Sequence, residues 1–392
     1  LMRLDMSTPL AIADPSSALL MLVLALAFCA LAAVVCAAAG RLVIPWLVKR
    51  KINDGEQRKA SDYLRMLHSD KKNTPTMGGA FIVPAWLAVV AVGGGVMTLM
   101  GFDPVRVWSA LGLGALVVLG NAALGFYDDY CKLTKRGKDG ISSRAKLAAQ
   151  TLIAVAAAVG AWWLVGEEGR VLVLPFANVD IGLWMIPLGT FVIVGAGNAY
   201  NLTDGLDGLA GGTGSIAFYA MAGGAALIAA FGSASSLSLE AALLGCAASG
   251  ALLGFLYWNR HPAKVFMGDT GSLSLGALLG FVAVLARLEL LLAVVGGVFV
   301  VEALSVMLQV GYFKATHGKR IFRCAPLHHH FQFGGWHETK VTRHFVAAAC
   351  ACAFVGLALA ATFVRVPENP QERAKTKLPR EESTLKNVVV SR

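Results

Sequence analysis

The sequence predicts an all-α, polytopic integral membrane protein with about ten transmembrane helices. Of its 392 residues, 56% are hydrophobic and only 15% are charged, and the mean hydropathy is +0.64. So few charges cannot cover the surface of a water-exposed globular protein. The apolar residues form continuous runs, whereas the strands of a membrane β-barrel would alternate apolar and polar residues. Composition and run length therefore both favour helices in a lipid bilayer.

Ten apolar runs are long enough to cross a bilayer core about 30 Å thick, which takes roughly 20 residues per helix. The first run also resembles a signal peptide ending at residues 37–39, but it is longer than such a core, and basic residues follow it as in a stop-transfer segment. We interpret residues 1–364 as one transmembrane domain and residues 365–392 as a disordered basic tail. The runs cover residues 19–40, 77–101, 107–127, 147–165, 181–199, 209–231, 241–258, 271–286, 290–313 and 345–364.

Basic residues fall mainly on one side of these runs. The loops at 41–72, 132–146, 260–264 and 314–343 hold 23 Lys and Arg residues, whereas the intervening loops hold only Arg106, Arg170 and Arg287. Since short cytoplasmic loops are rich in Lys and Arg, we expect the first set to face the cytoplasm and both termini to lie outside. The basic residues behind the net charge of +10 then set the orientation in the membrane and form a rim that faces the lipid headgroups. We expect no nucleic-acid partner.

The polar motifs of the chain lie in five loops on this predicted cytoplasmic side. These loops are residues 71–79, 128–132, 198–208, 259–272 and 326–330. Carboxylates so close to apolar helix ends are costly to hold ionised, so we expect them to bind a cation or one another. Because the five loops share a side, they predict an active site at the cytoplasmic face.

The pair Asp128 and Asp129 suits phosphate chemistry. Two adjacent carboxylates, with Lys132 close behind, offer the hard oxygen ligands that a magnesium-phosphate centre needs. A solvated helix end is the alternative interpretation, but carboxylates at a helix C-terminus oppose the helix dipole. A functional role for Asp128 and Asp129 is therefore favoured over that of a plain helix end.

The other aspartates allow two interpretations from the residues alone. Asp204 and Asp207 would share one face if their segment is helical, and the glycines beside them would allow close approach of a ligand. Asp-Gly pairs are also ordinary turn chemistry. Asp269 opens a crossing and resembles a helix N-cap, which would explain it without any catalytic role.

The three consecutive histidines at 328–330 are better suited to contacts with a phosphate or carboxylate than to a metal. The side chains of neighbouring residues rarely reach the same ion. Nearby Lys, Arg and His side chains can make charge-assisted contacts with an anionic substrate. Glu302, inside the ninth apolar run, is expected to face the bundle and to be paired or protonated.

The order of five motifs resembles the polyprenyl-phosphate N-acetylhexosamine-1-phosphate transferases. The motifs are TPTMGG at 74–79, DDYCK at 128–132, NAYNLTDGLDGLAGG at 198–212, FMGDTGS at 266–272 and APLHHHF at 325–331. The last motif is typical of the branch whose donor is UDP-N-acetylmuramoyl-pentapeptide. The resemblance covers roughly residues 40–364 and departs at Asn73, where the family often has glycine, and in the basic tail.

The resemblance implies that the domain 1–364 is catalytic and lies in the bacterial cytoplasmic membrane. It would transfer phospho-N-acetylmuramoyl-pentapeptide from the UDP-linked donor to undecaprenyl phosphate, releasing UMP and forming the first lipid-linked intermediate of peptidoglycan synthesis. The resemblance also implies a Mg²⁺ cofactor bound by Asp269, and it leaves open whether the enzyme is a homodimer. The implied catalytic residues are Asp128, Asp129, Asp269 and His328, and the implied substrate-binding residues are Lys71, Thr76, Lys132, Asn201, Asp204, Gly205, Asp207, Asn259, Phe266, His329 and His330.

Three other functions fit the sequence less well. A transporter should place polar groups near the bilayer midplane and show repeat symmetry, whereas these motifs crowd one edge. An intramembrane prenyltransferase should carry two NDxxD-like boxes, where this chain has DDxxK. The nearest alternative is a transferase of N-acetylglucosamine-1-phosphate, against which the PLHHH loop argues.

Overall fold

The computed structural model describes residues 15–50, 52, 71, 73–134, 140–174, 177–231 and 237–363, and the predicted tail 365–392 lies outside them. The described chain is helical apart from short loops, two 3₁₀ turns (Gly166–Arg170 and Gly182–Trp184) and one antiparallel hairpin, in which β1 (Val171–Val173) pairs with β2 (Asn178–Asp180). The helices are α1 (Pro15–Lys49), α3 (Gly79–Leu99), α4 (Pro104–Thr134), α5 (Ser143–Val165), α6 (Met185–Thr203), α7 (Leu209–Phe231), α8 (Ser238–Asn259), α9 (Gly268–Ala286), α10 (Glu289–Val295), α11 (Gly297–Ala315), α12 (Leu327–Phe333) and α13 (Glu338–Phe363).

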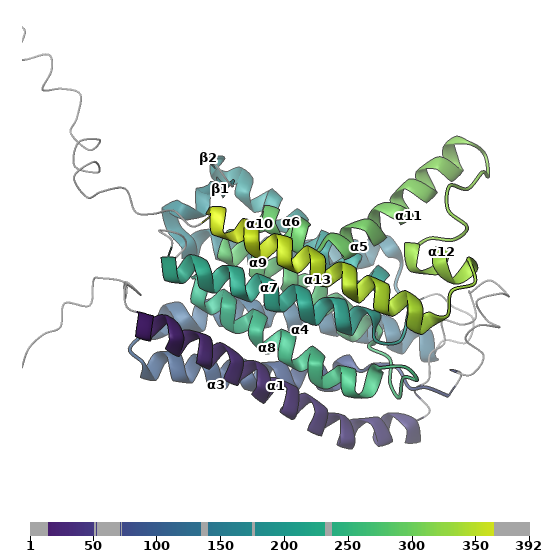
Figure 1. Ribbon diagram of the computed structural model, residues 1–392, viewed down its shortest axis with the longest axis horizontal. Coiled ribbons are helices and arrows are strands. Elements are labelled where there is room, and N and C mark those ends of the chain that lie inside the picture. The colour runs from purple at the N-terminus through teal and green to yellow at the C-terminus, as the bar shows by residue number, and fades with distance from the viewer. Residues whose placement is uncertain are drawn as a thin grey trace, which may run out of the picture.

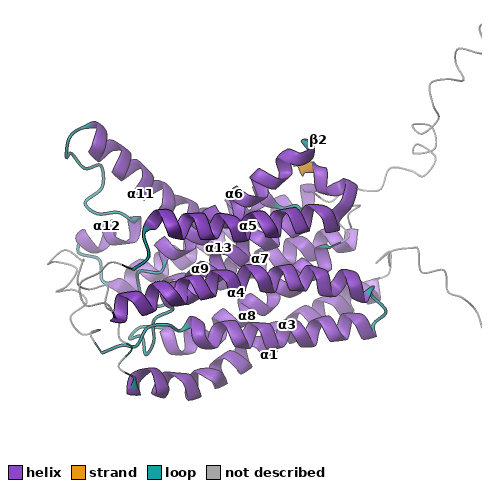
Figure 2. Cartoon of the chain, turned by 180° about the vertical axis from the view of Figure 1, so that it is seen from behind, coloured by secondary structure: helices purple, strands orange, loops and turns teal. Residues whose placement is uncertain are grey.

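Ten of these helices in the described chain are long and apolar enough to cross a membrane. They are α1, α3 to α9, α11 and α13, and Figures 1 and 2 show most of them lying side by side in one bundle. The prediction of an all-α, multi-pass membrane protein is therefore confirmed. The helices often extend beyond the apolar runs, because the polar residues at their ends continue the backbone hydrogen bonding; α1 runs on to Lys49 and α4 to Thr134.

Helix α9 forms the centre of the bundle. Every residue from Asp269 to Ala286 is buried, and the helix contacts α3 to α8 and also α10. Small residues allow these close contacts, as is common between membrane helices. A Cβ added at Gly276 would lie 2.8 Å from the backbone oxygen of Ala196 on α6, and one added at Gly125 on α4 would collide with the carbonyl of Asp269. The glycines thus let α4 approach the start of α9 and α6 approach its middle.

The ninth predicted crossing is wrong in one respect, because the apolar run 290–313 is not one helix. It is divided at Gly296 into the short α10 and the longer α11, which leans away from the bundle in Figure 1. Two consecutive glycines at this point have little helix propensity, so the helix can break there. Only α11 of the two is long enough to span a membrane.

Candidate active site

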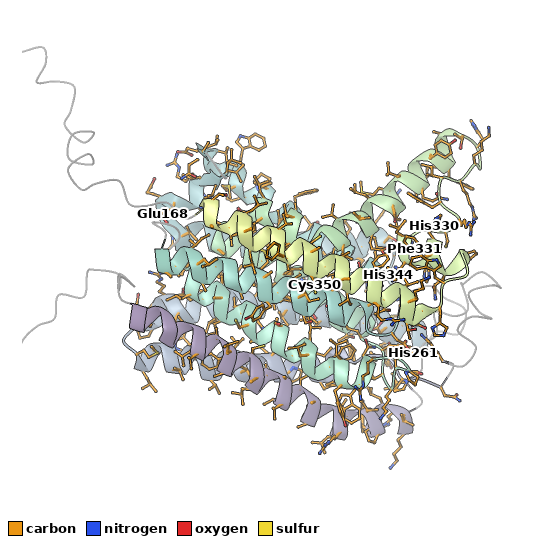
Figure 3. The ribbon with its side chains drawn as sticks, in the orientation of Figure 1. Glu168, His261, His330, Phe331, His344 and Cys350 are labelled. Carbon is orange, nitrogen blue, oxygen red and sulfur yellow. The ribbon has the colours of Figure 1, made fainter. Side chains whose placement is uncertain are left out.

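The five motif loops gather at one end of the bundle, which we call the motif end. In Figure 3, His261, His330, Phe331 and His344 lie toward this end, whereas Glu168 lies at the opposite end beside the β1–β2 hairpin. Backbone bonds join the loops directly: the N–H of Phe266 donates to the carbonyl of Pro75 at 2.8 Å, and the N–H of Gly78 donates to the carbonyl of Phe266 at 2.8 Å. The motifs that the sequence places on one side of the membrane therefore also lie close together.

The first cluster at the motif end joins two aspartates through two lysines. Lys146 Nζ lies 3.0 Å from Asp128 Oδ2 and 2.6 Å from Asp269 Oδ2. Lys132 Nζ contacts the same two oxygens, at 3.1 and 3.2 Å. Asp128 also accepts a hydrogen bond from the backbone N–H of Ile141, at 2.6 Å. Two buried carboxylates are thus balanced by two ammonium groups, as the cost of burying charge requires.

Asp129 binds the start of α9. Its carboxylate accepts from the backbone N–H groups of Asp269 and Thr270, at 3.3 and 3.1 Å, and from the Thr270 hydroxyl at 2.8 Å. These N–H groups belong to the first turn of a helix, where an anion is favoured. The interpretation of Asp269 as an N-cap is therefore wrong: the N-cap position is Met267, and Asp129 of α4 satisfies the helix start instead.

Asn201 and Thr76 lie beside this cluster. Asn201 Nδ2 donates to Asp269 Oδ1 and to Ser272 Oγ, at 2.8 Å each, so the end of α6 orients the Asp269 carboxylate. Gly268 adopts a φ of +71°, and a Cβ added there would lie 2.9 Å from Asp129 Oδ2 and 3.0 Å from Thr76 Oγ1. Only glycine combines this conformation with this close approach.

A second cluster forms around Lys71. Its ammonium group lies 2.7 Å from Asp207 Oδ1 and 2.6 Å from both carboxylate oxygens of Glu338. His261 Nδ1 lies 3.1 Å from Asp207 Oδ2. Lys71 also stands 5.9 Å from the centre of the Phe266 ring, within the range of a cation–π contact. The cluster joins four segments that are far apart in the sequence.

The segment 204–208 is a turn and not a helix, so Asp204 and Asp207 do not share a helix face as one interpretation expected. Helix α6 ends at Thr203, and Gly208 has a φ of +73°. The turn is fixed from outside: the N–H of Gly208 donates to Asn259 Oδ1 at 3.0 Å, and Asn259 Nδ2 donates to the carbonyl of Val265 at 2.9 Å. Asn259 therefore sets the distance between the turn and the loop that carries Phe266.

His328 is buried and held by Glu302. Its backbone N–H donates to Glu302 Oε1 at 3.1 Å, and its Nδ1 lies 3.2 Å from Glu302 Oε2. Glu302 is thus paired, as the sequence suggests. The other ring nitrogen, Nε2, has no hydrogen-bond partner among the described residues, and it packs so tightly against Gly205 that an added Cβ would collide with it. The ring therefore presents Nε2 to the turn 204–208.

The other two histidines lie apart from these clusters. The His329 ring packs at a tilt against His328, with ring centres 4.1 Å apart, and its Nδ1 lies 2.8 Å from Gln332 Oε1. His330 Nδ1 accepts the backbone N–H of Arg323 at 3.1 Å, and its ring contacts Phe322. The structure thus brings His328 next to the turn, whereas His330 organises the loop before α12.

Sequence reasoning did not single out Lys146, His261 or Glu338. In the sequence Lys146 is one of six basic residues in the loop 132–146, and its only distinction is that it directly precedes an apolar run. Glu338 is the only carboxylate in the sequence between residues 303 and 367. An isolated acid in a long basic and apolar stretch is a signal that could have found it.

Two sets of ligands at the motif end could hold a divalent cation. Asp128 and Asp269 turn their Oδ2 atoms toward the same two ammonium groups, and oxygen ligands of this kind suit Mg²⁺. The second set is Asp207, His261 and Glu338, whose ligand atoms lie within 4.8 Å of one another. Its imidazole suits a transition metal better. The oxygen-only set is therefore the better fit for magnesium.

An apolar groove runs between α5 and α6. It has a volume of about 530 Å³, and it begins beside Leu147, the residue after Lys146. Its polar residues include Asn198, whose Nδ2 donates to Gln150 Oε1 at 3.1 Å. The other lining residues are Thr151, Val155, Ile186, Pro187, Thr190, Phe191, Val194 and Gly195. An apolar chain in this groove would have its end next to the Asp128–Asp269 cluster.

Comparisons with known proteins show the family to which the chain belongs. Residues 110–287 match glycosyl transferase family 4. The phospho-N-acetylmuramoyl-pentapeptide-transferase of Shouchella clausii is 41% identical over 317 residues, which cover 81% of this chain and 91% of the relative. Proteins of the same name from Desulfosudis oleivorans and Francisella tularensis are 43% and 39% identical, over 75% and 82% of this chain and 83% and 88% of the relatives. Such identity over most of both chains shows that the protein belongs to the phospho-N-acetylmuramoyl-pentapeptide-transferases, within glycosyl transferase family 4.

Proposed function

We propose that this protein transfers phospho-N-acetylmuramoyl-pentapeptide from its UDP-linked donor to undecaprenyl phosphate. A phosphate oxygen of the lipid attacks the β-phosphorus of the donor, which bears the sugar. The bond from that phosphorus to the bridging oxygen breaks, and UMP leaves with this oxygen. One observation carries the proposal: Lys146, in a cluster of lysines and aspartates suited to phosphate, directly precedes Leu147, which lines one end of an apolar groove. A lipid phosphate and a water-soluble nucleotide can meet there.

The Lys71 cluster is our candidate for the nucleotide end of the donor. Lys71 offers charge to a phosphate, and Phe266 beside it offers a ring on which a base can stack. Asp204, Asp207 and Asn259 are proposed to meet uracil and ribose groups through their oxygen and amide atoms. Gly205 would let the backbone approach the ligand, and Thr76, Asn201, Lys132, His329 and His330 complete the proposed substrate-binding set.

The acceptor is proposed to lie along α5 and α6. The groove there is lined almost wholly by apolar side chains, which suit a polyprenyl chain. Its phosphate would then lie near Lys146 and Lys132, which can neutralise its charge. The second pKa of a phosphate monoester is near 6, so the attacking oxygen is largely ionised at neutral pH and needs no strong general base.

Magnesium is the proposed cofactor, with Asp269 as its principal ligand. When bound, it would supply charge neutralisation for the diphosphate. Asp128 and the lysines would orient the reacting phosphates, and Asp129 would hold the start of α9. His328 would contact the donor from its position beside the turn 204–208. These roles follow from the contacts of each side chain and await test by substitution.

We propose that the motif end faces the cytoplasm, because the Lys- and Arg-rich loops lie there. A cysteine introduced at His337, which is exposed at the motif end, should then react with a membrane-impermeant maleimide only in inverted vesicles. A cysteine at Glu167, which is 93% exposed near the hairpin, should react only in intact cells from which the outer barrier has been removed. Labelling of both from one side would contradict the orientation.

The function is tested by offering the purified protein two donors with undecaprenyl phosphate. UDP-N-acetylmuramoyl-pentapeptide should release UMP in a reaction that EDTA stops and Mg²⁺ restores. UDP-N-acetylglucosamine should release none above background. Release of UMP from the second donor alone would instead make the protein an N-acetylglucosamine-1-phosphate transferase, the nearest alternative.

A further inference from the structure

Glu338 connects four segments at the motif end. It lies in the first turn of α13, and both its oxygens accept from Lys71 Nζ at 2.6 Å. Its Oε1 also accepts the backbone N–H of Asp207 at 2.6 Å, and its Oε2 lies 3.8 Å from His261 Nδ1. One carboxylate therefore joins the start of α13 to the chain before α3, the turn 204–208 and the loop between α8 and α9.

We propose that Glu338 is a positioning residue of the donor site, which holds Lys71 and the turn 204–208 ready for an anionic nucleotide. This proposal rests on the proposed function. The ammonium group of Lys71 lies between two carboxylates, those of Asp207 and Glu338, and beside the Phe266 ring. A long lysine side chain loses considerable rotamer freedom when it is fixed in this way. Because Glu338 already fixes the Lys71 side chain in the free protein, this entropy is lost before the donor binds.

Glu338 can release Lys71 without becoming an unpaired buried charge. It keeps the N–H of Asp207, and its place in the first turn of α13 is favoured by the helix dipole. His261, with 35% of its side chain exposed, lies 3.1 Å from Asp207 Oδ2 and remains a hydrogen-bond partner of Asp207 when Lys71 turns away. Lys71 can therefore exchange one carboxylate for a phosphate of the donor, while the turn remains fixed.

The proposal predicts a separation of binding from chemistry, because Glu338 has no contact with the lysines or aspartates of the Asp128–Asp269 cluster among the bonds of the described residues. Glu338→Gln keeps the shape and one acceptor oxygen but loses the charge that holds Lys71. It should raise the KM for the UDP-linked donor about tenfold and leave kcat and the KM for the lipid within twofold. Glu338→Asp should recover part of the donor affinity.

A double-mutant cycle distinguishes positioning from a merely structural role. If Glu338 acts through Lys71, then Lys71→Met with Glu338→Gln should bind donor no more weakly than Lys71→Met alone. Thermal unfolding in detergent shows that each variant is folded, and Glu167→Gln, an exposed glutamate near the hairpin, is the matched control that should change nothing. Losses that multiply in the double variant would overturn the proposal, as would a fall in kcat at unchanged KM.

Affinity for UMP, measured by calorimetry on the wild type and the same five variants, separates this proposal from the proposed function. UMP binding requires no transfer, so it reports on Lys71 and Glu338 whether or not the wild type turns over the donor. A UMP affinity that is about tenfold weaker in Glu338→Gln, and unchanged by Glu338→Gln in the Lys71→Met background, is the expected result. An affinity unaffected by Glu338→Gln would overturn the positioning role even in a fully active transferase.

Discussion

Replacing Lys146 by methionine removes the ammonium group that binds both Asp128 and Asp269. The side chain keeps its length and apolar stem, so the change is mainly one of charge. Breaking a buried ion pair costs about 3–5 kcal/mol. Lys146 is 19% exposed, and Lys132 remains within 3.2 Å of the same oxygens, so we expect the lower value, about 3 kcal/mol. Lys132→Met removes longer contacts from a more exposed side chain and should cost less.

Two measurements check this expectation for Lys146→Met. The unfolding temperature in detergent should fall without Mg²⁺ and recover in part with it, because a divalent cation would neutralise the same two carboxylates. UMP release should fall by roughly 10- to 150-fold, the equivalent of one charge-assisted contact of about 1.5–3 kcal/mol with a phosphate. A variant that unfolds at the wild-type temperature without Mg²⁺ and keeps wild-type turnover would refute the reasoning.

Three further predictions concern other groups. Asp269→Asn should lose activity by several orders of magnitude through loss of magnesium, and Asp128→Asn should lose less and recover part of its rate at raised pH; a flat, inactive pH profile for Asp128→Asn would contradict direct attack by the lipid phosphate. Gly205→Ala should cut UMP release more than tenfold in a folded protein, because the new Cβ displaces the His328 ring, and normal turnover would remove that ring from the site. At the hairpin end, burial raises the pKa of Glu289 to about 7, so the stability of the protein should fall as the pH rises from about 4.5 toward 7. The melting temperature should therefore be lower at about pH 7 than at about pH 4.5, and Glu289→Gln should abolish this difference.

The crossings could be predicted from the sequence because the bilayer imposes a length on each apolar run. Their ends could not, since polar residues such as those of 128–134 continue a helix beyond the end of its apolar run. The division at Gly296 also escaped prediction. A glycine pair occurs in many straight membrane helices, so its effect on α10 and α11 depends on the packing around it.

The motif residues could be assigned to one end, but their partners could not be read from spacing. Lys146 meets Asp269 across 123 positions, and Glu338 meets Lys71 across 267, so neither pairing leaves a local pattern. The role of Asp129 shows the same limit. A carboxylate beside another carboxylate suggests a shared ligand, whereas the fold directs Asp129 to the backbone of α9.

The burial of α9 has a consequence for how the protein is assembled during synthesis. Six of its packing partners in the described chain, α3 to α8, precede it, and α10 follows it. The helix carries Asp269, Thr270, Ser272 and Ser274 in its first turns. Polar groups of this kind partition poorly into lipid alone. We therefore expect α9 to insert between helices that have already assembled, so that Asp269 meets Asp128, Lys132 and Lys146 in one step of membrane insertion, before α12 and α13 add His328 and Glu338.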